Sequence, residues 1–225
     1  MNSIDIEKLL SQKIKNSQLY TDSLTHRSAS NKNNERLEFF GDAILGFFIA
    51  EYLYDKFPDD NEGDLSRKRS HLVRKDTLSK IGAHFNLGKK IILGAGERKS
   101  GGNKRDSIIA DALEALIAVV YLVDGPEVAR SFIHKVFDSF IKSLPSNDDL
   151  KDAKTKLQEI LQAQNCELPQ YETKEVNIKN KISFVTLCKI IEHNICEDGD
   201  GSNKRKSQQV AAEKALNKIS KIYKK

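Results

Sequence analysis

The stretch that decides how this chain folds is Asn34-Glu-Arg-Leu-Glu-Phe-Phe-Gly-Asp-Ala-Ile-Leu45. Most of its residues are apolar, and the apolar run continues to Ile49. Three acids, Glu35, Glu38 and Asp42, interrupt it at spacings of three and four residues. At about 100° per residue, these acids fall within roughly a 60° arc of one helix face. The pattern therefore predicts a buried helix that carries carboxylates along one side.

A second apolar stretch, Ile108-Ile-Ala-Asp-Ala-Leu-Glu-Ala-Leu-Ile-Ala118, repeats this arrangement. Its only charged residues, Asp111 and Glu114, are three positions apart and share a face. Burying unpaired carboxylates is unfavourable, so such clusters need partners. A single acid is usually paired with Lys or Arg or faces water, but here only Arg36 is interleaved with two acidic pairs. Oxygen ligands without Cys or His indicate a site for Mg²⁺, with Mn²⁺ as a substitute, rather than for zinc.

The net charge of +5 is concentrated at one end of the chain. Residues 151–225 contain 15 Lys and Arg and 10 Asp and Glu; subtracting these from the totals of 37 and 32 leaves 22 of each in residues 1–150. This asymmetry indicates a module that binds a polyanion, attached to a part with a different task. A carboxylate-held cation can lower the pKa of water and neutralise charge on a phosphate. Hydrolysis of phosphodiester bonds is therefore the chemistry that fits both parts.

The periodicity of apolar residues divides the chain into two regions. Residues 1–143 predict helices, the clearest over 36–54, 66–85 and 107–122. The glycine-rich segment 94–102 lacks the Lys-Ser or Lys-Thr ending of a phosphate loop and predicts a mobile surface loop. The last third predicts a helix over 153–164, strands over 171–178, 182–190 and near 191–197, a turn at 198–202 and a helix over 207–222.

These motifs resemble those of the ribonuclease III family. The stretch 34–45 is similar to the family signature NERLEFLGDAVL, from which it departs at Phe40 and Ile44. Four further segments resemble the family's other sequence blocks and occur in the same order. They are Leu24-Thr-His-Arg-Ser-Ala29, Glu62-Gly-Asp-Leu-Ser-Arg67, Leu72-Val-Arg-Lys-Asp-Thr-Leu78 and the segment 107–117. The resemblance implies an all-α endonuclease domain over 1–146, a linker at 147–151 and a small α+β (α-β-β-β-α) domain over 152–222 that binds double-stranded RNA.

The resemblance also implies roles for individual acids. The four essential acidic positions of the family are occupied by Glu38, Asp42, Asp111 and Glu114. Glu38, Asp111 and Glu114 would ligate Mg²⁺, and Asp42 and Glu114 would be the residues designated catalytic. Glu35 and Glu62 match two auxiliary acids beside the scissile phosphate.

The resemblance further implies a homodimer in which each acidic centre cuts one RNA strand. The products would carry 5′-phosphate and 3′-hydroxyl ends with a two-nucleotide 3′ overhang, and ribosomal RNA precursors are expected substrates. Phe39 matches an aromatic residue that packs into the partner subunit, with an ordinary core position as the alternative. A catalytically silent RNA-binding regulator and a helical scaffold for an acidic protein are competing functions. The presence of all four acids favours the enzyme.

A basic cluster marks the start of the last predicted helix. Lys204, Arg205 and Lys206 lie where the helix dipole and free backbone N–H groups already favour a phosphate. In the resemblance, Thr155 and Gln158 match residues that touch the minor groove of RNA, where shape and 2′-hydroxyls are read. The loop 177–181 departs from the family because it lacks the histidine that enters a second minor groove.

Three cysteines, Cys166, Cys188 and Cys196, lack CxxC spacing and a neighbouring histidine cluster. They indicate reduced thiols in a cytoplasmic protein rather than a disulfide framework or a zinc site. A membrane partner is not expected, because no apolar run approaches about 18 residues. The first ten residues contain acids and no signal-like apolar core.

Overall fold

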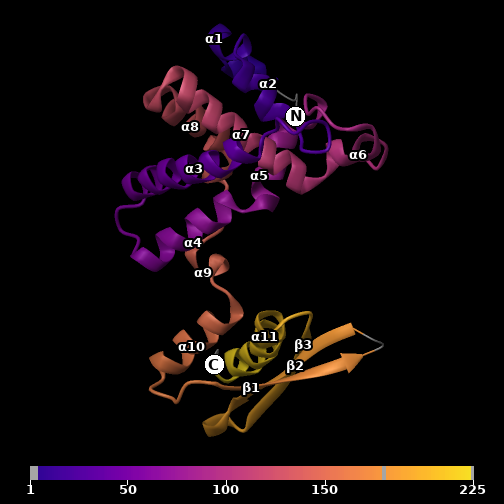
Figure 1. Ribbon diagram of the computed structural model, residues 1–225. Helices are drawn as coiled ribbons and strands as arrows, with labels where there is room; N and C mark the ends of the chain where they lie inside the picture. The colour runs from indigo at the N-terminus through magenta and orange to yellow at the C-terminus, as the bar shows by residue number, and fades with distance from the viewer. Residues whose placement is uncertain (1–4, 179–180, 224–225) are drawn as a thin grey trace. The chain divides into compact units, whose positions relative to one another are not determined.

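The chain forms two compact units, Met1–Leu144 and Pro145–Lys225, in the computed structural model (Figure 1). The structure describes residues 5–178 and 181–223. Residues 1–4, 179–180 and 224–225 lie outside the described residues. Residues 179–180 belong to the segment 177–181, in which the family histidine is missing. Within the described ranges, no helix has both the length and the apolar character that a membrane crossing requires.

Unit one is helical throughout its described residues, apart from a single isolated bridge between Thr25 and Ile92, and this confirms the predicted all-α class. Its elements are η1 (Ile6–Leu9), α1 (Gln12–Lys15), α2 (Gln18–Leu24), α3 (Glu35–Lys56), α4 (Glu62–Val73), α5 (Lys75–His84), η2 (Leu87–Lys89), α6 (Ala95–Lys99), η3 (Gly102–Lys104), α7 (Asp106–Asp124) and α8 (Pro126–Lys142). Helices α3 and α7 are the two that the apolar stretches predicted.

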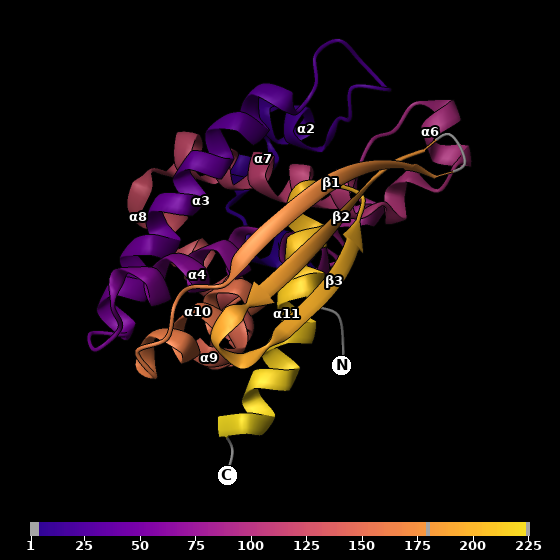
Figure 2. The ribbon, with the colours of Figure 1, turned by 90° about the horizontal axis from the view of Figure 1, so that it is seen from below.

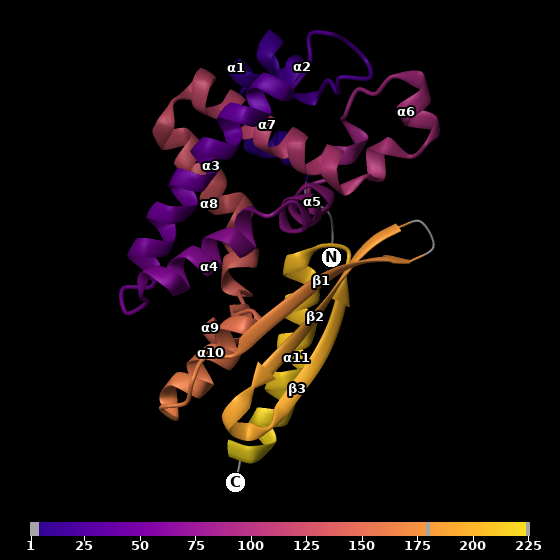
Figure 3. The same cartoon turned by 60° about the horizontal axis from the view of Figure 1, so that its bottom comes forward.

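Helix α7 is the centre of unit one. From Ile108 to Val120 every residue except Asp111 is buried, as expected for a helix that is apolar on all sides. Helices α1, α2, α3, α5 and α8 pack around it (Figure 3). Glu114 therefore lies within the hydrophobic core, with only 6% of its surface exposed.

Helix α3 crosses α7 at very close range because of Gly41. A Cβ atom at this position would overlap the backbone carbonyl of Glu114 and lie 3.2 Å from its Cα atom. Glycine is the residue that permits such close backbone approach. The crossing point therefore fixes Glu38 and Asp42, which flank Gly41 on α3, next to the acids of α7.

Two predictions for unit one were wrong in detail. The helix predicted over 66–85 is interrupted at Arg74, whose extended backbone (ψ 150°) ends α4 and begins α5. The segment predicted as a mobile loop over 94–102 instead contains the short helix α6 (Ala95–Lys99). A Cβ atom on Gly94 would overlap the carbonyl group of Ser28, whose hydroxyl accepts the Gly94 N–H at 3.0 Å.

Unit two has the predicted helix–strand–strand–strand–helix order. After a short helix α9 (Asn147–Leu150), its elements are α10 (Ala153–Ala163), β1 (Gln170–Ile178), β2 (Lys181–Ile190), η4 (Ile191–His193), β3 (Ile195–Gly201) and α11 (Lys204–Tyr223). The strands form an antiparallel sheet in the order β1-β2-β3, and α11 covers one face of it (Figure 2). Helix α10 packs on α11 over a core of Leu157, Leu161, Ala211 and Ile219.

The third strand lies further along the chain than predicted. Residues 191–193 form the turn η4, and the segment 198–201, predicted as a turn, pairs with β2 instead. The two glycines of β3 let α11 pack closely on the strand. A Cβ atom on Gly199 would overlap the α11 backbone at Ala211, and one on Gly201 would overlap it at Ser207. Helix α11 also begins at Lys204, three residues earlier than predicted.

We expect Gly41→Ala to destabilise the protein by about 1–3 kcal/mol, since overpacking at a rigid backbone contact forces α3 and α7 apart. The free energy of unfolding in urea measures this change. Gly96→Ala is the matched control, because a Cβ atom there would have no neighbour within 4 Å. Equal stability of the two variants would contradict the close-crossing argument.

Candidate active site and RNA-binding surface

The crossing of α3 and α7 brings the predicted metal-binding acids together. Glu38 comes from α3, Asp111 and Glu114 come from α7, and one carboxylate oxygen of each lies within 4.8 Å of the others. Asp42, one turn along α3 from Glu38, lines the same pocket as Glu38 and Glu114. Two pairs of acids from helices distant in sequence thus form one cluster, which we call the acidic cluster.

The acidic cluster carries unfavourable negative charge. Burial, together with the neighbouring Asp42, Glu38 and Asp111, raises the pKa of the Glu114 carboxyl to about 8, against a smaller opposing effect of Lys75. Burial also raises the pKa of Glu38, and Asp111 adds to this effect. These raised pKa values show that nearby positive charge only partly neutralises the clustered carboxylates in the folded chain.

Lys75 is a functional-site residue that the sequence analysis missed. It is the first residue of α5, and its Nζ atom lies 3.1 Å from Oδ1 of Asp111. The pKa of Lys75 is raised, first of all by this hydrogen bond. Its presence in the block 72–78 gave no sign of this role, because the lysine reaches Asp111 only through the packing of α5 on α7.

The donor set of the acidic cluster fits a hard divalent cation. Three carboxylates converge without a Cys or His ligand, and Mg²⁺ prefers oxygen ligands at about 2.0–2.1 Å. Glu38, Asp111 and Glu114 are therefore the residues that would hold Mg²⁺ or Mn²⁺.

The two auxiliary acids lie in different places. Glu35 lines the same pocket as Glu38 and Asp42, and it pairs with Arg27 at 3.4 Å. Glu62 accepts a hydrogen bond from Ser66 on α4 and shares a separate pocket with Tyr54. Tyr54 is 16 residues beyond Glu38 on α3, which is about 24 Å along the helix axis. Within one chain, Glu62 is therefore not part of the acidic cluster.

Phe39 is 81% exposed, so it is not a core residue of this chain. Phe47 and Tyr54, eight and fifteen residues further along α3, are 62% and 74% exposed. Spacings of seven and eight residues place these side chains on one helix face, and we call this face the aromatic stripe. A largely apolar pocket lined by Phe39, Phe40 and Leu122 lies beside its first residue.

The basic cluster of unit two is exposed at the start of α11. Lys204, Arg205 and Lys206 all face solvent, and the side chain of Asn203 caps the helix by accepting the Lys206 N–H at 2.9 Å. Within residues 5–178 and 181–223, neither Lys204 nor Lys206 forms a salt bridge with an acid. Both ammonium groups are thus available to an external anion.

Helix α10 begins beside this basic cluster. The Lys154 ammonium group donates to Oε1 of Gln208 at 2.7 Å, which links the first turns of α10 and α11. Thr155 is half-buried in that first turn of α10, and Gln158 is exposed one turn further on. The predicted minor-groove residues and the predicted phosphate contacts therefore come from two helices that are fixed to each other at their amino-terminal ends.

A chain of hydroxyl groups, of which those of Thr186 and Ser207 are buried, holds α11 on the sheet. The Ser207 and Thr186 hydroxyl oxygens are 2.7 Å apart, and those of Thr186 and Thr173 are 2.9 Å apart. Gln208 completes the chain by donating to Thr173 at 3.3 Å. Because each hydroxyl group has a partner, the start of α11 is fixed in position although it is polar.

The fold and the two surfaces define a nucleic-acid-processing protein, with a cluster of carboxylates in one unit and an exposed basic helix start in the other. The chain matches the family model described as Ribonuclease-III-like over residues 16–140, and that described as Double-stranded RNA binding motif over residues 153–219. This chain belongs to the ribonuclease III family.

Individual relatives agree with this assignment. Ribonuclease 3 of Dechloromonas aromatica is 44% identical over 97% of this chain and 99% of its own length. Ribonuclease 3 of Vibrio atlanticus is 45% identical over 99% of this chain and 100% of its own length. The nuclease domain of ribonuclease III from Campylobacter jejuni, described as flexible in a region involved in dimer formation, has 40% sequence identity. Its TM-score is 0.57 over 60% of this chain and 94% of that domain.

We expect the metal-free protein to lose stability as pH rises from about 4.5 to about 8. The folded state keeps a proton on Glu114 in this window, whereas the unfolded state releases it near the ordinary pKa of 4.5. The contribution is at most about 1.4 kcal/mol per pH unit. Urea unfolding in EDTA at several pH values, compared with Glu114→Gln, isolates it.

Mg²⁺ should restore the stability of the original chain at pH 8 and have little effect on Glu114→Gln. Glu127→Gln is the control, since that acid pairs with Arg130 on α8 and should behave as the original chain does. If the original chain and Glu114→Gln had the same pH slope in EDTA, the protonated state assigned to Glu114 would be wrong.

Proposed function

We propose that this protein is an endonuclease that cleaves double-stranded RNA by Mg²⁺-dependent hydrolysis of phosphodiester bonds. The observation that carries the proposal is the convergence of the Glu38, Asp111 and Glu114 carboxylates at the crossing of α3 and α7. The match of unit two to a double-stranded RNA binding motif supports the substrate class. Carboxylates at this spacing, in a chain that also carries an exposed basic helix start, fit phosphate chemistry better than any alternative function.

Each residue of the acidic cluster has a distinct task in this proposal. Glu38, Asp111 and Glu114 would hold the cation, and Lys75 orients Asp111 through their 3.1 Å contact. When bound, the cation neutralises charge on the phosphate and lowers the pKa of water. Asp42 is exposed beside Glu114, where its carboxylate can accept a proton from the attacking water.

The proposed reaction balances as a simple hydrolysis. The water oxygen attacks phosphorus, the bond from phosphorus to the 3′ oxygen breaks, and the 3′ oxygen takes a proton. One product end is therefore a 5′-phosphate and the other a 3′-hydroxyl. Two centres acting on opposite strands would leave the two-nucleotide 3′ overhang that the family resemblance implies. We further propose ribosomal RNA precursors and other structured transcripts as substrates, in the cytoplasm.

The aromatic stripe supports a homodimer through unit one. An exposed phenylalanine next to an apolar pocket on the same helix can be buried symmetrically, with Phe39 of each subunit entering the pocket beside the other's α3. Glu38 precedes Phe39 directly, so a dimer of this kind would place two acidic clusters on either side of one interface.

We expect Glu114→Gln to lower the rate of hairpin cleavage by at least about 10³-fold, since a bound cation is worth several kcal/mol of transition-state stabilisation. The substrate is a labelled RNA hairpin of about two helical turns, in Mg²⁺ or in EDTA. RNA binding, followed by gel shift in EDTA, should be unchanged because the basic cluster is intact.

Glu127→Gln, which changes an acid outside the acidic cluster, serves as the control and should cleave normally. Cleavage by Glu114→Gln at the normal rate would exclude the proposed metal site. Tight binding without cleavage by the original chain, in Mg²⁺ and in Mn²⁺, would instead favour the catalytically silent regulator.

Replacing Lys204 and Lys206 together by Ala should weaken duplex RNA binding and flatten its salt dependence. Each lost phosphate contact removes roughly one from the slope of log K against log salt concentration. The control removes two charges from the later turns of the same helix, Lys214→Ala with Lys221→Ala, and should leave the slope unchanged. Equal slopes for the two double variants would exclude the start of α11 as the phosphate contact.

Phe39→Ser should shift the protein towards monomers, because it removes a large apolar contact from the proposed interface. Sedimentation velocity over a range of concentrations measures the effect, which we expect as a weakening of dimerisation by at least about tenfold. Ile222→Ser, which changes an exposed apolar residue of unit two, should have no effect. A monomeric original chain would overturn the dimer proposal.

A further inference from the structure

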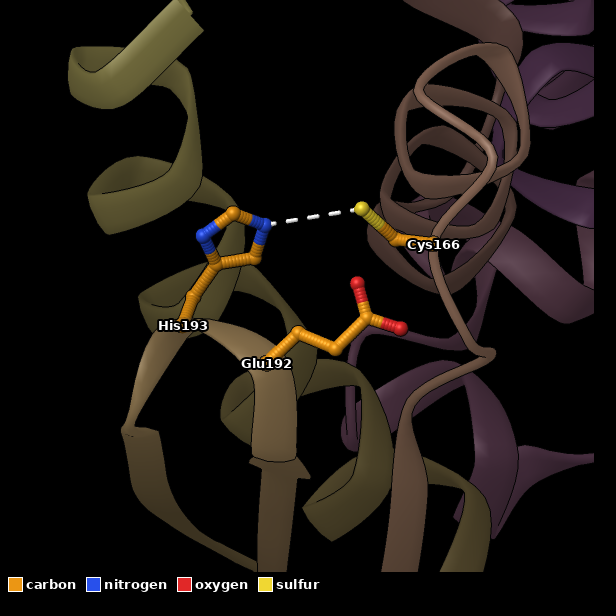
Figure 4. Close-up of side chains that lie close together, drawn as sticks. All are labelled: Cys166, Glu192 and His193. Carbon is orange, nitrogen blue, oxygen red and sulfur yellow. Dashed lines mark hydrogen bonds between the residues drawn. The ribbon is translucent and has the colours of Figure 1, made fainter.

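A second group of potential metal ligands lies in unit two. It consists of Cys166, which follows the end of α10, and of Glu192 and His193 in η4, between β2 and β3 (Figure 4). Cys166 and His193 are 27 positions apart in sequence, and Figure 4 shows their side chains facing each other. One ligand atom from each of the three residues lies within 4.8 Å of the others.

The spacing of the thiol and the imidazole matches that of a tetrahedral metal site. Bonds of about 2.3 Å to sulfur and about 2.0–2.1 Å to nitrogen, at a tetrahedral angle, put the two ligand atoms about 3.6 Å apart. The Sγ atom of Cys166 and the Nε2 atom of His193 are 3.6 Å apart. Both atoms are thus already at ligand distance from a common point between them.

Neighbouring groups hold these ligands in place. Oε1 of Glu192 accepts the backbone N–H of Glu167 at 2.9 Å, which fixes the carboxylate beside the cysteine segment. The Tyr223 hydroxyl lies 2.7 Å from Nε2 of His193 and 3.6 Å from Sγ of Cys166. The hydroxyl uses the Nε2 position that a cation would take, so metal binding would displace Tyr223 from that nitrogen. Four polar side chains from three segments therefore converge on one point.

We propose that Cys166, His193 and Glu192 form a binding site for a borderline-soft divalent cation, with Zn²⁺ as the natural occupant. A thiolate, an imidazole and a carboxylate are the usual zinc ligands, whereas Mg²⁺ avoids sulfur. Binding replaces the thiol proton, which is released to solvent, and a water molecule completes four-coordination. The site is thus chemically distinct from the all-oxygen acidic cluster.

The position of this site predicts what it does. Its ligands come from the segment after α10 and from the β2–β3 connection, so a bound ion would cross-link these two segments beside the last turn of α11. Tyr223 is 19 residues beyond Lys204 on α11, which is about 28 Å along the helix axis. The ion should therefore stabilise the fold of unit two without occupying the basic cluster.

Titration of the full chain with Co²⁺ tests the proposal, in a thiol-free reducing buffer. Co²⁺ bound to a thiolate has an intense charge-transfer absorption, and four-coordination strengthens its visible bands, whereas ions on carboxylates alone have neither. We expect saturation at one thiolate-bound ion per chain and displacement by Zn²⁺. Absence of the charge-transfer band would overturn the proposal.

Variants assign the ligands. Cys166→Ser should weaken Co²⁺ binding by at least about 100-fold, and His193→Ala by at least about tenfold. Cys196→Ser, which changes an exposed cysteine on β3, and Glu114→Gln, which disrupts the acidic cluster, should both leave the band unchanged. A band that persists in Cys166→Ser, or is lost in Cys196→Ser, would contradict the assignment.

A measurement on the unaltered chain guards against variants that fold poorly. Zn²⁺ should slow alkylation of Cys166 at least about tenfold, since a metal-bound thiolate is a poor nucleophile, and leave Cys196 unaffected. Equal rates at Cys166 with and without Zn²⁺ would mean that the group is a hydrogen-bonded cluster only. RNA binding should be the same with and without Zn²⁺, so this result is independent of the proposed nuclease function.

Discussion

The close crossing of α3 and α7 at Gly41 is the constraint on which the rest of unit one depends. The same backbone contact closes the hydrophobic core and sets four carboxyl groups side by side. Packing favours this contact, whereas the burial of Glu114 and repulsion between the carboxylates oppose it, and both raise the pKa of Glu114. The protein thus uses the stability of its most buried helix to hold together groups that would otherwise separate.

Unit two places its charged residues by the same physical means. Glycines on β3 let the start of α11 lie against the strand, and buried hydroxyl groups of Thr186 and Ser207 fix it there. The basic side chains at the helix start therefore project from a rigid support. In both units, close backbone contact through glycine determines where charge is presented, acidic in one and basic in the other.

The features that could be predicted from the sequence are those that depend on local patterns of residues. Acids at three- and four-residue spacing in apolar helices were conspicuous because buried charge is rare, and the basic start of α11 lies within one short segment. Features that depend on tertiary contact were not predicted. The break at Arg74, the helix within 94–102, the register of β3 and the contact of Lys75 with Asp111 all belong to this group. The approach of Cys166 to His193 belongs there too, since no spacing rule links residues 27 apart.

Almost every side of helix α3 has a structural or a proposed functional role. One side, including Ile44 and Phe48, is buried in the core, another carries Glu38 and Asp42, and a third presents Phe39 and Phe47 to solvent. A helix with only one constrained side tolerates many substitutions, because residue type matters little over the other two-thirds of its circumference. A helix with three constrained sides tolerates few substitutions at any position. Within the stretch 34–48, almost every position therefore serves the core, the acidic cluster or the aromatic stripe.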